Sequence, residues 1–254
     1  MAGNENMYTM LNGALGDVSD PLAYNRYLEF LDLLGKRFKD NKWLAFYDIL
    51  NEPLYKYKYA HADGDINFYT KKQACELVED FYNALKNPNA DPNHLVSGGN
   101  LVTEDVILFD PSLMKLDFSQ PHLYSEKFIS YDGMNLTNKI NRVNGSTYWV
   151  YKNIPMPWIN GETGFPSSDV FPIGVNLVAG TNQDQKTYAD NILSSTRDHG
   201  GSGFTWWNFQ DGAWEEYGTE IFGYGLLILE SGIDKPAVNS FQSYLDPSTN
   251  QPPQ

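Results

Sequence analysis

The sequence has a single cysteine, few basic residues and no long apolar run, and each shortage excludes a class of protein. Cys75 cannot form an intrachain disulfide, and it lies on the apolar stripe of a predicted helix, where we interpret it as a small buried hydrophobic residue. Nowhere do 18 apolar residues follow one another, so no membrane-spanning helix is predicted. The first 20 residues lack a basic stretch followed by an apolar one, so no signal peptide is visible.

Positive charge is scarce: 18 Lys and Arg stand against 32 Asp and Glu, for a formal net charge of −14. Nucleic acids and anionic membranes are bound through cationic surfaces, so neither is expected as a partner. The sequence also lacks a dinucleotide glycine fingerprint, a phosphate-binding Walker loop and a zinc-binding His-Glu-x-x-His helix. Gly223-Tyr224-Gly225 is too short to count as a fingerprint. We therefore expect no cofactor and no metal, and a neutral ligand is compatible with this surface.

What is present is material for one folded domain, because 41% of the residues are hydrophobic and 15% are aromatic. No linker-like stretch divides the chain, so we predict one domain over residues 1–245 and a flexible tail over 246–254. Apolar patterning predicts strands at 7–11, 43–50, 94–98, 116–124, 156–162 and 203–209. It predicts helices at 21–39, 67–86, 103–109, 135–153 (in part, because Gly145 weakens it), 184–199 and 236–245. This alternation indicates a parallel sheet with crossover helices.

Two glutamates follow predicted strands. The apolar run from Trp43 to Leu50 stops on Asn51-Glu52-Pro53, and the strand at 156–162 ends in Glu162. Their separation of about 110 residues holds three strand–helix units of roughly 31 residues each, so in a barrel both lie on the same face. Paired carboxylates on one face suit glycoside cleavage, in which one protonates the leaving oxygen and the other attacks the anomeric carbon.

Each of these motifs alone also fits a structural role. A glutamate after a strand often starts a helix or faces solvent, His122 alone is more typical of a core or rim histidine, and Trp206-Trp207 alone is more typical of a core. The prediction depends on their order at successive strand ends.

As a set, the motifs resemble the C-terminal two thirds of a clan A retaining glycoside hydrolase, most closely the cellulase and mannanase family numbered five. The similar segments are Asn51-Glu52-Pro53, His122-Leu123-Tyr124, Gly161-Glu162-Thr163-Gly164, Gly203-Phe204-Thr205-Trp206-Trp207, Gly225-Leu226-Leu227 and Lys235-Pro236-Ala237.

The resemblance implies that Glu52 is the acid/base and Glu162 the nucleophile. It implies that Asn51, His122, Tyr124 and Trp207 bind substrate, with Asn51 on the sugar 2-hydroxyl, Tyr124 hydrogen bonded to Glu162 and Trp207 as the sugar platform. By strand alternation, Trp206 then points into packing.

The implied fold is a (β/α)8 TIM barrel of the α/β class that lacks its first two strand–helix units. The arginine that the family carries near its second strand has no counterpart here. Six of eight strands cannot close a barrel, so the chain is expected to be a fragment or to be completed by a second chain or copy along residues 7–11 and 203–209.

The expected function is that of a retaining endo-β-glycanase, such as a mannanase or cellulase, acting on a β-linked polysaccharide or oligosaccharide. The alternative is a non-catalytic carbohydrate-binding relative, or one piece of a split barrel, because the glutamate pair favours an enzyme while the missing arginine and strands favour a binder. A secreted or periplasmic location is expected, with any signal lying upstream of this chain.

Overall fold

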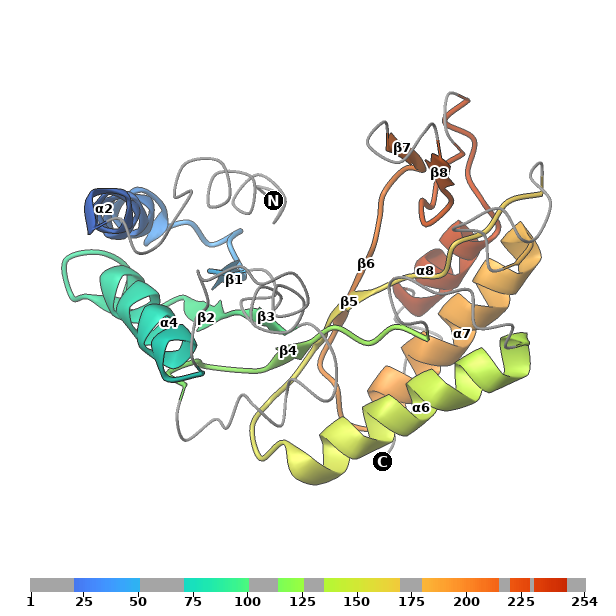
Figure 1. Cartoon of the computed structure of the whole chain (residues 1–254), viewed down its shortest axis with the longest axis horizontal. Coiled ribbons are helices and arrows are strands. Elements are labelled where there is room, and N and C mark those ends of the chain that lie inside the picture. The colour runs from blue at the N-terminus through green and yellow to red at the C-terminus, as the bar shows by residue number, and fades with distance from the viewer. Residues whose placement is uncertain are drawn as a thin grey trace, which may run out of the picture. The chain divides into compact units, whose positions relative to one another are not determined.

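The structure is a computed structural model that describes residues 21–50, 71–100, 114–125, 135–169, 180–214, 220–228 and 231–245. The chain divides into two compact units, Met1–Pro121 and His122–Gln254, whose elements are labelled in Figure 1. The predicted strand 7–11, the predicted helix 103–109, the tail 246–254 and the pair Asn51 and Glu52 lie outside the described residues. None of the described helices is both long enough and apolar enough to span a membrane.

The first unit contains helices α2 (Pro21–Phe38) and α4 (Lys71–Lys86) and four short strands, β1 (Phe46–Asp48), β2 (Leu95–Ser97), β3 (Gly99–Asn100) and β4 (Gln120–Pro121). Strand β1 pairs with β2, and β3 pairs with β4, in both cases parallel. Parallel neighbours need a crossover connection, and α4 provides it between β1 and β2. The predicted order of strand, helix and parallel strand is confirmed from β1 through α4 to β2.

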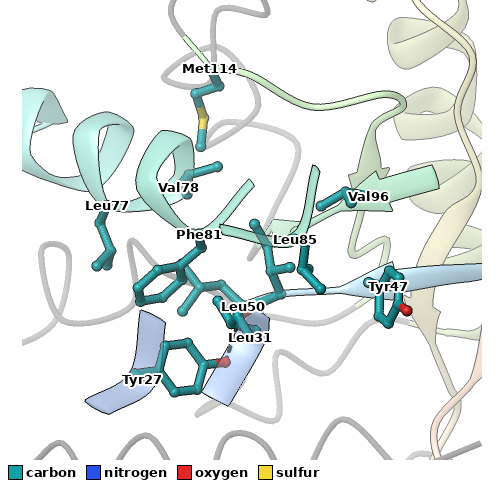
Figure 2. Packing of buried hydrophobic residues seen from close by; sticks show 11 residues of the cluster. Tyr27, Leu31, Tyr47, Leu50, Leu77, Val78, Phe81, Leu85, Val96 and Met114 are labelled. Carbon is teal, nitrogen blue, oxygen red and sulfur yellow. Dashed lines mark hydrogen bonds between the residues drawn. The ribbon is translucent and has the colours of Figure 1, made fainter. Parts of the chain in front are cut away.

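The core of the first unit lies between α2, α4 and the strands. Figure 2 shows Phe81 of α4 next to Tyr27 of α2, and the two ring centroids are 4.6 Å apart in an edge-on arrangement. The Tyr27 hydroxyl donates a hydrogen bond to the Ile49 carbonyl at 3.3 Å. Cys75, predicted to be buried, is half-buried and packs against this cluster. The cluster consists of Tyr27, Leu31, Tyr47, Ile49, Leu50, Leu77, Val78, Phe81, Leu85, Val96 and Met114.

Replacing Phe81 with alanine is expected to lower the free energy of unfolding by about 3–5 kcal/mol, because the fully buried ring leaves a cavity between the two helices. Urea unfolding followed by circular dichroism measures this loss. The matched control is Leu33→Ala on α2, whose side chain is 63% exposed and should change the free energy by no more than about 0.5 kcal/mol. Equal losses in both variants would contradict the assigned core.

The second unit contains helices α6 (Leu136–Asn153), α7 (Asn182–Asp198) and α8 (Ala237–Leu245) and strands β5 (Asn160–Thr163), β6 (Phe204–Trp206), β7 (Gly212–Trp214) and β8 (Glu220–Phe222). Helix α7 packs against both α6 and α8, as Figure 1 shows. Strands β5 and β6 pair parallel, whereas β7 and β8 form an antiparallel hairpin. Every described strand pairing outside that hairpin is parallel, which is the architecture expected of an α/β fold.

Helix α6 runs without interruption through Gly145, where the sequence predicts helix only in part. A glycine inside a helix costs about 1 kcal/mol relative to alanine. Val143, Thr147 and Val150 are buried along one face, and their packing outweighs this cost. Asn135 caps the helix by accepting a hydrogen bond from the Asn138 backbone at 3.0 Å.

Two further differences separate the prediction from the structure. The strand predicted from residue 43 begins only at Phe46, and Trp43 is 86% exposed, so the aromatic run does not begin in the sheet. The β7–β8 hairpin is absent from the prediction because no Asn-Gly or Asp-Gly turn marks it.

Candidate active site

Strand β5 directs Glu162 away from helix α7. Its neighbour Thr163 lies on the helix side, because its hydroxyl is 3.0 Å from that of Tyr188 on α7. Thr163 is paired in register with Trp206, whose ring is also against Tyr188, with centroids 6.1 Å apart. The carboxylate of Glu162, the residue before Thr163, instead meets Tyr124.

Glu162 meets the segment 122–124 through both its backbone and its carboxylate. Residues His122 and Glu162 form a parallel bridge, and the Leu123 amide donates to the Glu162 carbonyl at 2.8 Å. The Tyr124 hydroxyl donates to Oε1 of Glu162 at 2.6 Å, and Nδ1 of His122 lies 3.7 Å from Oε2. Glu162 is only 9% exposed and His122 is buried. The hydrogen bond implied by the resemblance, from Tyr124 to Glu162, is present.

These contacts hold the Glu162 carboxylate in a fixed position. A hydroxyl bond of 2.6 Å to a carboxylate oxygen is in the range of strong, charge-assisted hydrogen bonds. Hydrogen bonds donated to the charged form favour it over the protonated form. An ionised, fixed carboxylate at a strand end is the chemical requirement for attack on an electrophilic carbon.

The turn after Glu162 requires glycine. A Cβ atom at Gly164 would lie 2.3 Å from the Trp207 carbonyl oxygen and 2.8 Å from Cδ1 of Tyr224, so no larger residue fits without displacing backbone. The Trp207 amide in turn donates to the Thr163 carbonyl at 2.7 Å. The backbone of the proposed platform tryptophan is thereby fixed against the turn that follows Glu162.

Trp206 packs between helices, as predicted. Its ring lies 5.4 Å from that of Phe241 on α8 and 6.1 Å from that of Tyr188 on α7, measured between centroids. Its indole Nε1 donates to the Tyr224 carbonyl at 2.9 Å. The Trp206 side chain is therefore held by helices α7 and α8.

Of the six residues predicted for the site, His122, Tyr124, Glu162 and Trp207 lie in the second unit and are described. The structure brings His122, Tyr124 and Glu162 into contact and places the Trp207 backbone against the turn after Glu162. Asn51 and Glu52 lie outside the described residues. Within the described part of the chain, no group of three His, Cys, Asp or Glu side chains is arranged to hold a metal ion.

Sequence reasoning missed Tyr224, which touches this site from the loop after β8. Its ring stands edge-on to that of Tyr124, with centroids 6.1 Å apart and an interplanar angle of 86°. The only signal in the sequence is the Gly-Tyr-Gly pattern at 223–225, which marks a place where backbone approaches backbone closely.

Replacing Tyr124 with phenylalanine is expected to lower kcat/KM by about 10- to 100-fold if the chain hydrolyses a glycoside, because a hydrogen bond to a charged group is lost. The same loss should raise the pKa of the Glu162 carboxyl, so the acidic limb of the kcat/KM profile moves to higher pH. The control is Tyr148→Phe on α6, an exposed tyrosine. If the acidic limb is unchanged in Tyr124→Phe, the hydrogen bond from Tyr124 does not control the ionisation of Glu162.

No family model and no curated protein matches the chain. Solved structures do match. One is a β-glucuronidase from Bifidobacterium dentium complexed with coumarin-3-O-glucuronide, with a TM-score of 0.64 and 17% sequence identity; the match covers 88% of this chain and 34% of that chain. The β-glucuronidase of Ruminococcus gnavus (TM-score 0.60, 16% identity, 87% and 34%) and one from an uncultured Clostridium species (TM-score 0.58, 17% identity, 87% and 35%) also match.

The chain thus spans about a third of the length of the solved structures that it matches. At 16–17% identity the likeness establishes a shared fold, and it does so over nearly the whole of this chain. The chain has the α/β fold of the matched part of these β-glucuronidases.

Proposed function

We propose that this chain carries the catalytic glutamates of a retaining glycoside hydrolase, with Glu162 as the nucleophile. The observation that carries the proposal is the hydrogen bond of 2.6 Å from the Tyr124 hydroxyl to a nearly buried Glu162 at the end of a parallel strand. The likeness in fold to β-glucuronidases supports glycoside hydrolysis as the reaction class.

The proposed reaction has two displacements. Glu162 attacks the anomeric carbon while the glycosidic bond breaks, and Glu52 gives its proton to the leaving oxygen. Glu52 then takes a proton from water, which attacks the same carbon and releases Glu162. Two inversions restore the original configuration, and the two carboxyl groups of such enzymes stand about 5–5.5 Å apart. The assignment of Glu52 depends on the family resemblance of Asn51-Glu52-Pro53.

The proposed substrate is a β-linked polysaccharide or oligosaccharide cleaved internally, as by a mannanase or cellulase, outside the cell or in the periplasm. A second candidate is a small β-glucuronide, favoured because the similar solved structures are β-glucuronidases. The net charge of −14 disfavours an anionic sugar relative to a neutral one.

The test is hydrolysis of a panel of aryl β-glycosides (glucoside, mannoside, galactoside, xyloside and glucuronide) and of soluble β-mannan and β-glucan. Proton NMR of the first product decides the stereochemistry, and we expect the β-anomer to appear first. Early formation of the α-anomer would exclude double displacement. Binding of a glycan without hydrolysis of any substrate would favour the alternative, a non-catalytic carbohydrate-binding relative.

We also propose that a second chain or copy completes the barrel along residues 203–209, because six strand–helix units cannot close a barrel of eight. Among the described strands, β6 pairs with β5. Size-exclusion chromatography with light scattering should show an assembly larger than the 28.8 kDa chain, and a stable monomer would contradict this part of the proposal.

A further inference from the structure

The segment Gly223-Tyr224-Gly225 is fixed on both sides by backbone contact. A Cβ atom at Gly223 would lie 2.3 Å from the Ser167 carbonyl oxygen, and one at Gly225 would lie 2.0 Å from the Asp211 nitrogen. Any side chain at either position therefore collides with neighbouring main chain. The two glycines allow this loop to lie directly between residues 167 and 211.

Two buried side chains then hold the loop, Lys235 through the Gly223 carbonyl and Asp211 through the Gly225 amide. Lys235 Nζ donates to the carbonyls of Gly223 at 2.9 Å and Ser167 at 3.1 Å, and it pairs with Oδ1 of Asp211 at 2.7 Å. The same Asp211 oxygen accepts from the Gly225 amide at 2.9 Å. Burial lowers the pKa of the Lys235 ammonium, and the bond to Asp211 counteracts this in part.

Gln185 on α7 adds a second point of attachment. Its Nε2 donates to the carbonyls of Phe165 at 2.9 Å and of Gly223 and Gly225, each at 3.2 Å. The loop is thus bonded to the turn that follows Glu162 as well as to the chain after β6. Neither attachment reaches Glu162 directly.

This arrangement places the ring of Tyr224 at the candidate site. The ring stands edge-on to Tyr124, whose hydroxyl bonds Glu162, and its edge closes over Gly164. The carbonyl of Tyr224 also accepts hydrogen bonds from the Trp206 indole at 2.9 Å and from the Asn208 amide at 3.3 Å, the residues on either side of Trp207.

We propose that Tyr224 is a positioning residue for the proposed nucleophile: its ring, held by the Lys235–Asp211 pair and Gln185, keeps the Tyr124 hydroxyl on Glu162. The catalytic part of this inference rests on the proposed function. The contacts from Tyr224 through Tyr124 to Glu162 can be tested without measuring enzyme turnover. Edge-on aromatic pairs at this separation contribute to stability beyond their buried area, so removal of the Tyr224 ring takes away one packing partner that orients the Tyr124 ring.

The test is a double-mutant cycle on the full chain. Tyr224→Ala should lower kcat/KM by about 10- to 100-fold, the size expected of a displacement of up to 1 Å. It should also move the acidic limb of the kcat/KM profile to higher pH, by less than Tyr124→Phe does. In the Tyr124→Phe background the same change should add no further shift, because both act through one hydrogen bond. Tyr224→Phe, which keeps the ring, should restore the limb toward that of the unmodified chain.

Among the described residues, the groups that face Glu162 are Tyr124 and His122. A parallel series of variants that carry His122→Asn shows how much the imidazole contributes to the position of the acidic limb. Tyr148→Ala on α6 is the matched control for loss of a tyrosine ring and should leave the limb in place. Circular dichroism across the pH range separates acid unfolding from a true shift. Additive shifts in the double variant, or a limb unmoved in Tyr224→Ala, would overturn the proposal.

A readout without turnover separates this inference from the proposed function. In protein labelled with carboxyl ¹³C-glutamate, the Glu162 signal is identified by its loss in Glu162→Gln and titrated by NMR. If no glycoside is hydrolysed but Tyr224→Ala raises the Glu162 midpoint, the proposed function fails and the positioning role stands. If glycosides are hydrolysed and the midpoint does not move, the positioning role fails alone.

Discussion

Replacing Glu162 with alanine is expected to lower kcat/KM for every glycoside substrate at least about 10⁴-fold, because loss of the nucleophile removes the covalent route as a whole. The loss should be similar for aryl glycosides with good and poor leaving groups, since attack is needed in both cases. The neighbouring contacts need not collapse, because Tyr124 and His122 are held by the backbone bridge at 122–123 as well as by the carboxylate. Steady-state kinetics measures the effect.

The matched control is Glu79→Gln, which removes an exposed carboxylate of α4 in the first unit. It should leave kcat/KM within twofold of the unmodified chain. Residual activity of Glu162→Ala above about 1% that survives repurification would contradict the nucleophile assignment.

Replacing Glu52 with alanine should give a loss that depends on the leaving group. For unactivated substrates kcat should fall about 10²- to 10⁴-fold, the usual contribution of general acid catalysis. A dinitrophenyl glycoside needs no proton on departure, so its first step should be nearly unaffected. Kinetics on a series of aryl leaving groups measures this difference, and Glu162→Ala should not show it.

Added azide distinguishes the two variants further. In Glu52→Ala, azide replaces water in the second step and should give the β-glycosyl azide, whereas in Glu162→Ala it attacks in place of the carboxylate and should give the α-glycosyl azide. Identical behaviour of the two variants on activated substrates would show that the roles of acid and nucleophile are wrongly assigned.

The sequence predicted the helices well because each has an apolar face at helical spacing. Helix α2 starts at Pro21 and α8 ends at Leu245, as expected from their patterns, and α7 stops where Gly200 takes a positive φ of 77°. The strands are shorter than predicted, because apolar runs extend beyond the residues that pair. Trp43 illustrates this: it belongs to the apolar run by composition, yet it lies in solvent.

In the candidate site, the family resemblance implied the contact of Tyr124 with Glu162, and strand alternation predicted that Trp206 points into packing. The contacts that hold Tyr224 at the site could not be predicted from the sequence. Lys235 and Asp211 are 24 residues apart, and their pairing depends on the path of the β7–β8 hairpin between them. A local sequence pattern does not distinguish a buried lysine from an exposed one. The same applies to Tyr224, whose partner Tyr124 lies 100 residues earlier.

The most direct measurement of the central claim is covalent trapping of the intermediate. The chain is incubated with a 2-deoxy-2-fluoro β-glycosyl fluoride of the sugar identified by the panel, which slows the second displacement more than the first. Intact mass spectrometry followed by peptide mapping then locates the sugar. The account predicts one glycosyl group per chain, attached to Glu162, and no labelling of Glu162→Gln. A stoichiometric label on Glu52 or on any other side chain would contradict it.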